Sequence, residues 1–191
     1  MMVTMSYFPI ETERLLLRQF RLSDVDATAA YEGLPEVARY CSWEPRTRRR
    51  IKELIPRWIA MDGLGAKSEG IQYAVVLKAS GRQIGDCVLM FDDIAARQGQ
   101  LGYVMDPAHQ GRGYTTEAAR AVLGVGFDRV GLHRISARCD TRNFASWRVM
   151  EKLSMRREAH FREHAIFKGE WDEEFVYAML EDEWRAQQGA V

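Results

Sequence analysis

Short apolar blocks separated by turn-forming residues run along the whole chain and predict a sheet of about six or seven strands. The first block, Thr12–Arg18, lies between charged residues. A later pair of blocks meets at Ser80-Gly81, a dipeptide typical of a hairpin turn. Two more strands are expected in the tail between Met155 and Met179. The remaining strands are expected at Gln72–Leu77, Gln83–Leu89, Gln100–Met105 and Arg134–Cys139.

Apolar residues at helical spacing predict the helices of the N-terminal half. Ser23 suits the N-cap of a helix that runs toward Leu34 and ends before Pro35. A second, basic helix is expected from residue 46 to about residue 61, where Pro56 should kink or divide it. Its apolar face comprises Ile51, Leu54, Ile55 and Trp58. The segment 63–70 is expected to be a loop.

Two helices are also expected in the second half of the chain. The longer runs from about Thr115 to Val130, and Gly124 and Gly126 weaken its later part. The shorter spans Ala145–Leu153. The order of elements predicts a mixed α/β fold, with residues 1–191 as a single domain and a β-α-β unit at its centre.

Composition narrows the class of protein. The chain has 191 residues, 47% of them hydrophobic, and 27 basic residues balance 27 acidic ones. These values exclude a disordered or collagen-like chain, and the neutral total argues against a nucleic-acid partner. The charges are nevertheless segregated, because Arg46–Arg57 has six basic residues against one acid and Glu170–Glu183 has seven acids and no base.

Cysteine and histidine usage indicates no metal site. The three cysteines are far apart in sequence, and the four histidines do not combine with them at a zinc-ligand spacing. The odd, sparse cysteine count is typical of reduced thiols, and the start of the chain does not resemble a signal peptide. No apolar run approaches the length needed to span a bilayer. We therefore expect a cytoplasmic protein without a membrane partner.

The most informative segment is Gln100–Ala119, QLGYVMDPAHQGRGYTTEAA. A strand ends near Pro107, and a loop with Gly111 and Gly113 leads directly into a helix. Unpaired N–H groups of a first helical turn and the helix dipole favour a phosphate or pyrophosphate. Thr116 excludes a Rossmann fingerprint, and the spacing excludes a Walker A loop. From these residues alone, a simple glycine-bearing turn is the alternative.

Five ordered motifs resemble the GNAT acetyltransferase superfamily, and within it the Rim-type branch that includes the N-terminal acetyltransferases of ribosomal proteins. They are ETERLLLR, YCSWEP, LGYVMDPAHQGRGYTTEA, NFASWRVMEKLSM and FKGEWDEEFVYAMLEDEW. This resemblance covers nearly the whole chain, and its most specific part is GRGYTTEA. It implies a mostly antiparallel, twisted sheet flanked by helices around a β-α-β acyl-CoA-binding core.

The resemblance also implies a set of residues that bind acetyl-CoA as co-substrate. The pyrophosphate would lie on backbone amides of the glycine loop, and the pantetheine arm would pair with the end of the preceding strand. Asn143 would hydrogen-bond the pantetheine, although it also suits a helix N-cap. Ser146 would lie near the thioester sulfur. The remaining cofactor-binding residues are Tyr103, Val104, Met105, Gln110, Gly111, Arg112, Gly113, Tyr114 and Thr115.

The implied chemistry is direct attack of an amine on the thioester, which needs a base and a proton donor. Two positions depart from the family pattern, since Gln100 replaces the usual Glu and Met150 replaces a frequent Tyr. Ser146 remains as a catalytic hydroxyl, and Glu163 is the base that we select. The other candidate bases are His164, Asp92 and Asp93. A further departure, Ser154 in place of Gly, affects only the turn after its helix.

The leading hypothesis is an acetyl-CoA-dependent N-acetyltransferase. Its acceptor would be a protein N-terminus or a small amine, with Trp43 and Trp171 as candidate walls of the acceptor site. A catalytically silent acyl-CoA-binding module is the alternative hypothesis. Relatives in this family often pair, so a homodimer is a further expectation.

Overall fold

A computed structural model describes residues 6–63 and 69–189. Within these residues, eight strands form one sheet in the order β1-β2-β3-β4-β5-β6-β8-β7. Every neighbouring pair is antiparallel except β5 and β6. The strands are β1 (Ile10–Glu11), β2 (Leu15–Gln19), β3 (Gly70–Leu77), β4 (Arg82–Asp93), β5 (Gln98–Met105), β6 (Arg134–Asp140), β7 (Arg156–Phe167) and β8 (Glu170–Leu180).

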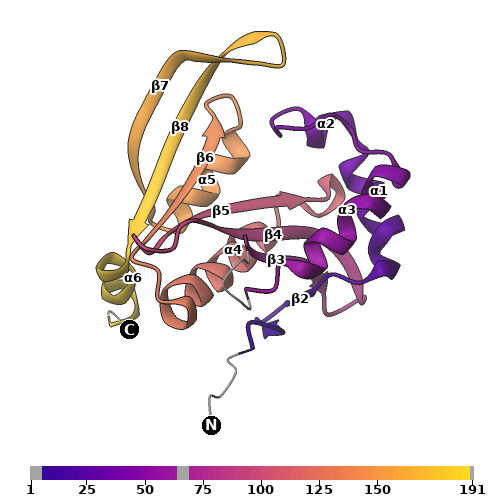
Figure 1. Ribbon diagram of the computed structural model, residues 1–191, viewed down its shortest axis with the longest axis horizontal. Helices are drawn as coiled ribbons and strands as arrows, with labels where there is room; N and C mark the ends of the chain where they lie inside the picture. Colours follow the sequence, from indigo (N-terminus) through magenta and orange to yellow (C-terminus); the bar gives the residue numbers. More distant parts are fainter. Residues whose placement is uncertain (1–5, 64–68, 190–191) are drawn as a thin grey trace.

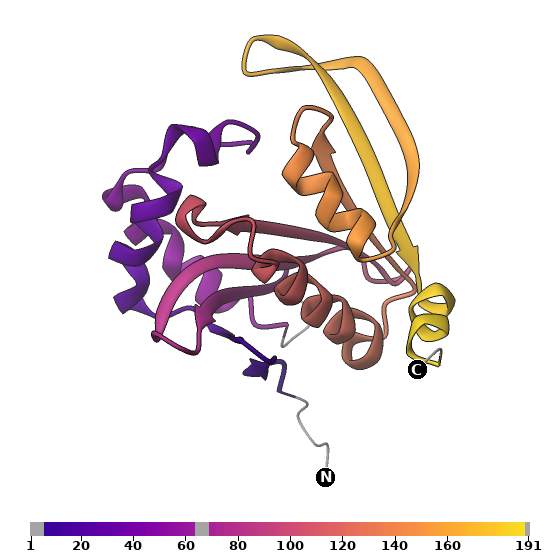
Figure 2. The same cartoon turned by 180° about the vertical axis from the view of Figure 1, so that it is seen from behind.

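Helices cover both faces of this sheet (Figures 1 and 2). On one face lie α1 (Val25–Glu32) and α3 (Arg48–Ala60), with the short α2 (Pro35–Ala38) above them. On the other face lie α4 (Tyr114–Gly124), which continues into a π-helical turn (Val125–Val130), and α5 (Phe144–Lys152). The last helix is α6 (Glu181–Gln188). No helix of the described ranges is long and apolar enough to cross a membrane.

The sequence-based prediction of a mixed α/β fold is confirmed, although β1, α2 and the C-terminal α6 were not predicted. β1 has two residues, too few to show any alternation. α1 ends at Glu32, before Pro35 as expected, and Pro35 is also the first residue of α2, a position where its missing N–H costs nothing. Pro56 lies within α3 without dividing it. Most of the expected 63–70 loop lies outside the described residues.

The expected 115–130 helix changes from α-helix to π-helix at Val125, and the π-helical turn packs closely against the sheet. Gly126 is buried, and a Cβ atom there would lie 2.5 Å from the side chain of Ile135 and 3.2 Å from that of Leu89. Only glycine therefore allows the π-helical turn to approach β4 and β6 this closely. The turn carries the chain from α4 into β6, which completes the central β-α-β unit.

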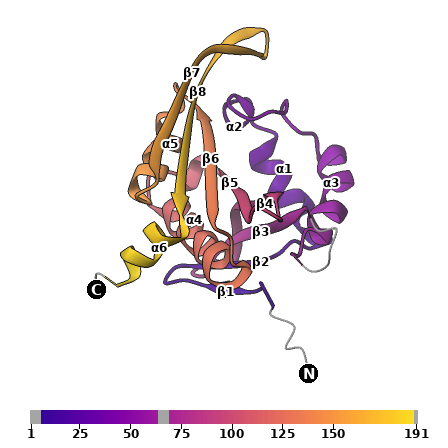
Figure 3. The same ribbon diagram turned by 60° about the vertical axis from the view of Figure 1, so that its left-hand side comes forward.

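The parallel contact between β5 and β6 is short. Only Gln98–Gln100 of β5 pair with Arg134–Ser136 of β6, and the rest of β5 has no β6 partner. β8 and β7 continue the sheet from β6, so the sheet divides into two parts that separate beyond Gln100 (Figure 3). The end of β5 therefore offers an open edge on its β6 side.

The tip of the long β7–β8 hairpin contacts the N-terminal half of the chain, across the gap between the two parts of the sheet. Lys168 and Gly169 both have positive φ, as the two-residue turn between Phe167 and Glu170 requires. The Lys168 ammonium donates to the carbonyl oxygens of Ala38 and Trp43, each at 2.9 Å. The hairpin is thus tied to the end of α2 and to the segment between α2 and α3.

Ser154 ends α5 in a strained conformation. Its φ is +62°, which is unfavourable for residues other than glycine. The Met155 amide donates to the Met150 carbonyl and the Ser154 amide to that of Glu151, the two hydrogen bonds of a Schellman motif. The side chain at position 154 is exposed. The sequence departure noted at Ser154 therefore costs conformational energy without an evident packing gain.

We predict that Ser154→Gly stabilises the protein by about 0.5–1 kcal/mol, because glycine adopts positive φ freely. Thermal unfolding should show a rise of about 1–4 °C. Ser154→Ala is the matched control, since alanine keeps the Cβ strain and should give no increase. Equal melting temperatures for the two variants would contradict the explanation.

Candidate functional site

The glycine loop presents backbone amides at the N-terminus of α4. Gly111 and Gly113 have φ values of +73° and +80°, and Gly113 is the N-cap of the helix. A Cβ atom at Gly111 would meet no other atom within 4 Å, so the backbone there is open to an incoming group. The first amides of α4 have no acceptor within the helix. Together these features form a site for an anion.

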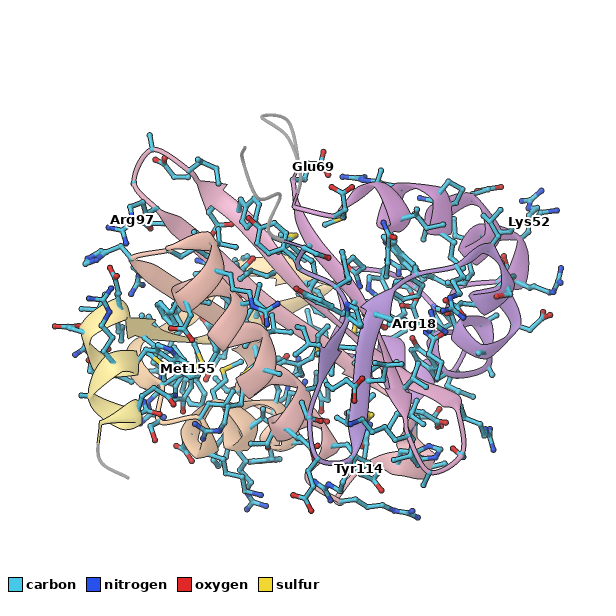
Figure 4. All side chains as sticks on the ribbon, turned by 90° about the horizontal axis from the view of Figure 1, so that it is seen from below. Arg18, Lys52, Glu69, Arg97, Tyr114 and Met155 are labelled. Carbon is cyan, nitrogen blue, oxygen red and sulfur yellow. The ribbon has the colours of Figure 1, made fainter. Side chains whose placement is uncertain are left out.

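Hydrogen bonds to the Glu117 carboxylate connect this loop and α4 to the turn before β2. Glu117, in the first turn of α4, accepts hydrogen bonds from the Thr12 hydroxyl and the Arg14 guanidinium, both at 2.6 Å. Arg14 also donates to the carbonyl of Arg112 at 3.0 Å and lies over the ring of Tyr114. Figure 4 labels Tyr114, the first residue of α4. Partial burial raises the pKa of Glu117, but these hydrogen bonds outweigh it and lower the pKa below its usual value. The turn before β2 therefore holds the loop in place.

A groove of about 580 Å³ runs from the glycine loop to α5. Arg142, Arg148 and Lys152 line it against a single acid, Glu36, so the groove is basic. The residues that we expected to bind cofactor line it too, except Arg112, whose carbonyl contacts Arg14. Those present are Tyr103, Val104, Met105, Gln110, Gly111, Gly113, Tyr114, Thr115, Asn143 and Ser146.

Asn143 and Ser146 meet β5 at the inner wall of the groove. The Asn143 side chain accepts from the Ser146 amide, which makes Asn143 the N-cap of α5. The Tyr103 hydroxyl donates to the Ser146 carbonyl at 2.9 Å and lies 3.1 Å from the Ser146 hydroxyl. Burial raises the pKa of Tyr103 well above its usual value. A neutral pair of hydroxyl groups therefore lies beside the open end of β5.

A second cavity, of about 520 Å³, lies on the other side of the divided sheet. Aromatic rings of Trp43, Trp58 and Phe167 contribute to its walls. Residues Tyr40, Cys41, Tyr103 and Val104 line both the groove and this cavity. The two spaces therefore adjoin where β5 leaves β6.

The second cavity is acidic. Five carboxylates line it against the guanidinium groups of Arg46 and Arg138. Arg46 is paired with the buried Glu32 at 2.7 Å and stacks on Trp43. The carboxylates are Glu32, Asp86, Asp140, Asp172 and Glu174. Of the two charged segments noted in the sequence, 170–183 thus supplies two acids to the cavity, whereas 46–57 supplies Arg46.

The structure separates the other candidates predicted from sequence. Trp43 lines the acidic cavity, but Trp171 is 60% exposed and lines neither space. Glu163 and His164 lie on the exposed β7 strand, and neither lines the groove or the cavity. Asp92 and Asp93 are also exposed and away from both.

Sequence reasoning missed Asp86, which is only 6% exposed and lies in the cavity wall. Its signal was present, since it is the one charged residue of the predicted strand QIGDCVL. The basic residues of the groove were missed as well. Arg142, Arg148 and Lys152 are spaced along α5 and the turn before it, and no charge run marks them.

Comparison with known proteins identifies the family. Residues 14–156 match the acetyltransferase (GNAT) domain model. The chain is 34% identical over 175 residues to a Bacillus subtilis protein named as the uncharacterized N-acetyltransferase YnaD, covering 92% of this chain and 98% of that one.

Solved structures show the same fold. A GNAT-family acetyltransferase from Bacillus anthracis superposes with a TM-score of 0.81 at 31% identity, over 92% of this chain and 99% of that one. Ribosomal-protein-S5-alanine acetyltransferase from Vibrio fischeri shares the fold at 22% identity, with a TM-score of 0.76 and coverage of 93% and 98%. Spermidine N-acetyltransferase from Vibrio cholerae, solved with CoA and spermine, does so at 18% identity, with a TM-score of 0.78 and coverage of 91% and 99%. On the family match and the two relatives above 30% identity, the chain belongs to the GNAT family of N-acetyltransferases.

Proposed function

We propose that this protein transfers the acetyl group of acetyl-CoA directly to a compact, cationic primary amine. The observation that carries this proposal is the meeting of a basic groove and an acidic cavity at Tyr103 and Val104. An anionic thioester fits the first space and a cationic amine fits the second. Their reacting ends would meet at the open edge of β5.

The residues of the groove fit acetyl-CoA, which supplies the activated acyl group. Amides of residues 110–115 would hold the pyrophosphate, and the open space at Gly111 lets it approach the backbone. Arg148 and Lys152 are available for the remaining phosphate charge, whereas Arg142 is paired with Asp140 and Glu170. Asn143 would hold the pantetheine in addition to capping α5.

Backbone alternation identifies the amides that face the thioester. The Asp106 amide donates to the Ile84 carbonyl across the β4–β5 ladder. In an antiparallel pair such groups alternate along the strand, so the amides of Tyr103 and Met105 point away from β4. They therefore face the gap left by β6, where the pantetheine arm would add as a short strand. We assign the Met105 amide to the carbonyl oxygen of the thioester, whose developing negative charge it stabilises.

The acceptor cavity supports a small cation over a polypeptide. Its five carboxylates outnumber two guanidinium groups, and the Lys168 contacts of the β7–β8 hairpin bridge the two sides of the divided sheet. The Vibrio cholerae enzyme named for spermidine shares the fold. The Vibrio fischeri enzyme named for a ribosomal protein shares it too, so the charge of the cavity, and not the fold, supports this choice.

An acceptor panel tests the substrate class. Amine-dependent release of free CoA thiol should be at least about tenfold faster in kcat/KM for di- and polyamines than for peptides with a free N-terminus, because the second charge contacts the acidic wall. Faster acetylation of the peptides would contradict the cationic small-amine assignment. Tight CoA binding without turnover of any amine would favour a silent module.

We predict that Gly111→Val raises KM for acetyl-CoA by about tenfold or more, because its side chain blocks the approach of the pyrophosphate to the backbone. Steady-state kinetics at saturating amine measures the effect. Gly131→Val is the matched control: Gly131 has φ +76° and open space around it, but lies outside the groove. An unchanged KM in a folded Gly111→Val protein would refute the phosphate site.

Ser146 is assigned to the departing thiolate, with the Tyr103 hydroxyl beside it. We predict that Ser146→Ala lowers kcat by about tenfold and leaves KM for acetyl-CoA unchanged, because the hydroxyl acts only as the sulfur leaves. Pre-steady-state thiol release measures this step. A raised KM with normal kcat would instead indicate a binding role.

A further inference from the structure

We propose that Asp86 is the proton acceptor for the amine and binds its ammonium group in the acidic cavity. The proposal rests on the proposed acetyltransferase function and adds the base that the sequence does not supply at position 100. Gln100 lines the same cavity, but an amide side chain cannot take up a proton at neutral pH.

The register of the sheet places Asp86 beside the reaction site. Asp86 on β4 is the direct partner of Val104 on β5, and directly opposed residues project to the same face with Cβ atoms about 5 Å apart. Val104 lies at the junction of groove and cavity. An amine bound against Asp86 is therefore next to the strand that would carry the thioester.

Two neutral donors orient the Asp86 carboxylate. The Tyr31 hydroxyl donates to one oxygen at 2.8 Å, and the Gln72 amide donates to the other at 3.0 Å. Tyr31 is itself held by the Gln83 amide at 3.1 Å. A carboxylate accepts about four hydrogen bonds in total. Asp86 thus keeps acceptor capacity for an ammonium group.

Three of the other four carboxylates that line the cavity already face basic side chains. Glu32 is paired with Arg46 at 2.7 Å, and Asp140 with Arg142 at 2.7 Å. Glu174 lies 3.7 Å from Arg138 and 3.8 Å from His164. Asp86 differs because its two hydrogen-bond donors, Tyr31 and Gln72, are uncharged. No directly paired cation therefore cancels its attraction for an incoming ammonium group.

The surroundings also make Asp86 an unusually strong base. Burial and the charge of Glu32 raise the pKa of Asp86 to about 8, although Tyr31, Arg46 and Gln72 act in the opposite direction. A base whose pKa lies near the working pH takes a proton most effectively. The titratable and charged groups around Asp86 are Tyr31 and Glu32 of α1, Cys41 and Arg46 of the segment before α3, and Arg138, Asp140, Asp172 and Glu174 across the cavity.

Proton transfer to Asp86 precedes the attack of the amine on the thioester. An N–H bond of the ammonium group breaks, its electron pair stays on nitrogen, and the proton goes to the Asp86 carboxylate. The free amine forms the new C–N bond as the C–S bond breaks, and a second proton from nitrogen accompanies the departing sulfur as thiol. Asp86 then releases its proton to solvent, so each turnover yields acetylated amine, CoA thiol and one proton.

The test is the pH profile of kcat/KM for Asp86→Asn, with spermidine as the probe amine. Because the carboxylate is the active form, the wild-type rate should rise with pH through a limb near 8. The variant should lose at least about 100-fold at pH 7.5 and rise only as the amine itself deprotonates, near pH 10. Asp24→Asn is the control, since Asp24 is equally buried but pairs with Arg18 and lines neither space. The kcat/KM of Asp24→Asn should stay within about threefold of the wild-type value.

A second variant guards against misfolding of the first. Tyr31→Phe keeps the carboxylate but removes a hydrogen bond that lowers its pKa, so the limb should move to higher pH. Wild-type turnover with an unchanged limb in both variants would overturn the role of Asp86 and leave the proposed function standing. Absence of turnover by the wild-type protein with every primary amine tested would overturn both.

Discussion

Three residue pairs between β5 and β6 are the contact on which the rest of the molecule depends. These pairs fix how the two parts of the sheet align, and they stop early enough to leave the end of β5 without a neighbouring strand. Backbone groups that a longer ladder would satisfy are thereby left for a ligand. Both the groove and the cavity exist because this pairing stops at Gln100.

The balanced charge of the chain conceals a separation of charge in space. Basic side chains gather along the groove, all from α5 and the turn before it, and acids gather in the cavity beyond it, from segments far apart in the sequence. The acidic side carries a thermodynamic cost. Burial raises the pKa of Asp86, so its ionisation is less favourable in the folded protein than in the unfolded chain. The free energy of unfolding therefore falls as the pH rises from about 4 toward 8. A reactive carboxylate and a maximally stable fold are thus in conflict at this position.

Much of the fold was predictable because alternation and turn residues are local signals. The glycine loop was predictable for the same reason, since Gly111 and Gly113 stand between a strand and a helix. The acceptor side was not, because its residues come together only through sheet register. Asp86 meets Tyr31 and Val104 across 55 and 18 positions of sequence, respectively, whereas Glu163 has suitable chemistry and lies on an exposed strand. Residue type suggested a base, but tertiary packing decides which acid is desolvated.

The hydrogen bonds of Lys168 have a consequence for which sequence changes this protein can tolerate during evolution. A single side chain, which donates to two backbone carbonyls, links the hairpin to the end of α2 and the segment before α3. Backbone carbonyls are present whatever side chains surround them, so sequence drift in that segment does not remove the acceptors. Drift at the hairpin tip does act, because loss of the Lys168 ammonium removes both of these hydrogen bonds. The link across the divided sheet is therefore carried by one surface turn, whereas the walls of the groove and the cavity meet at the centre of the sheet.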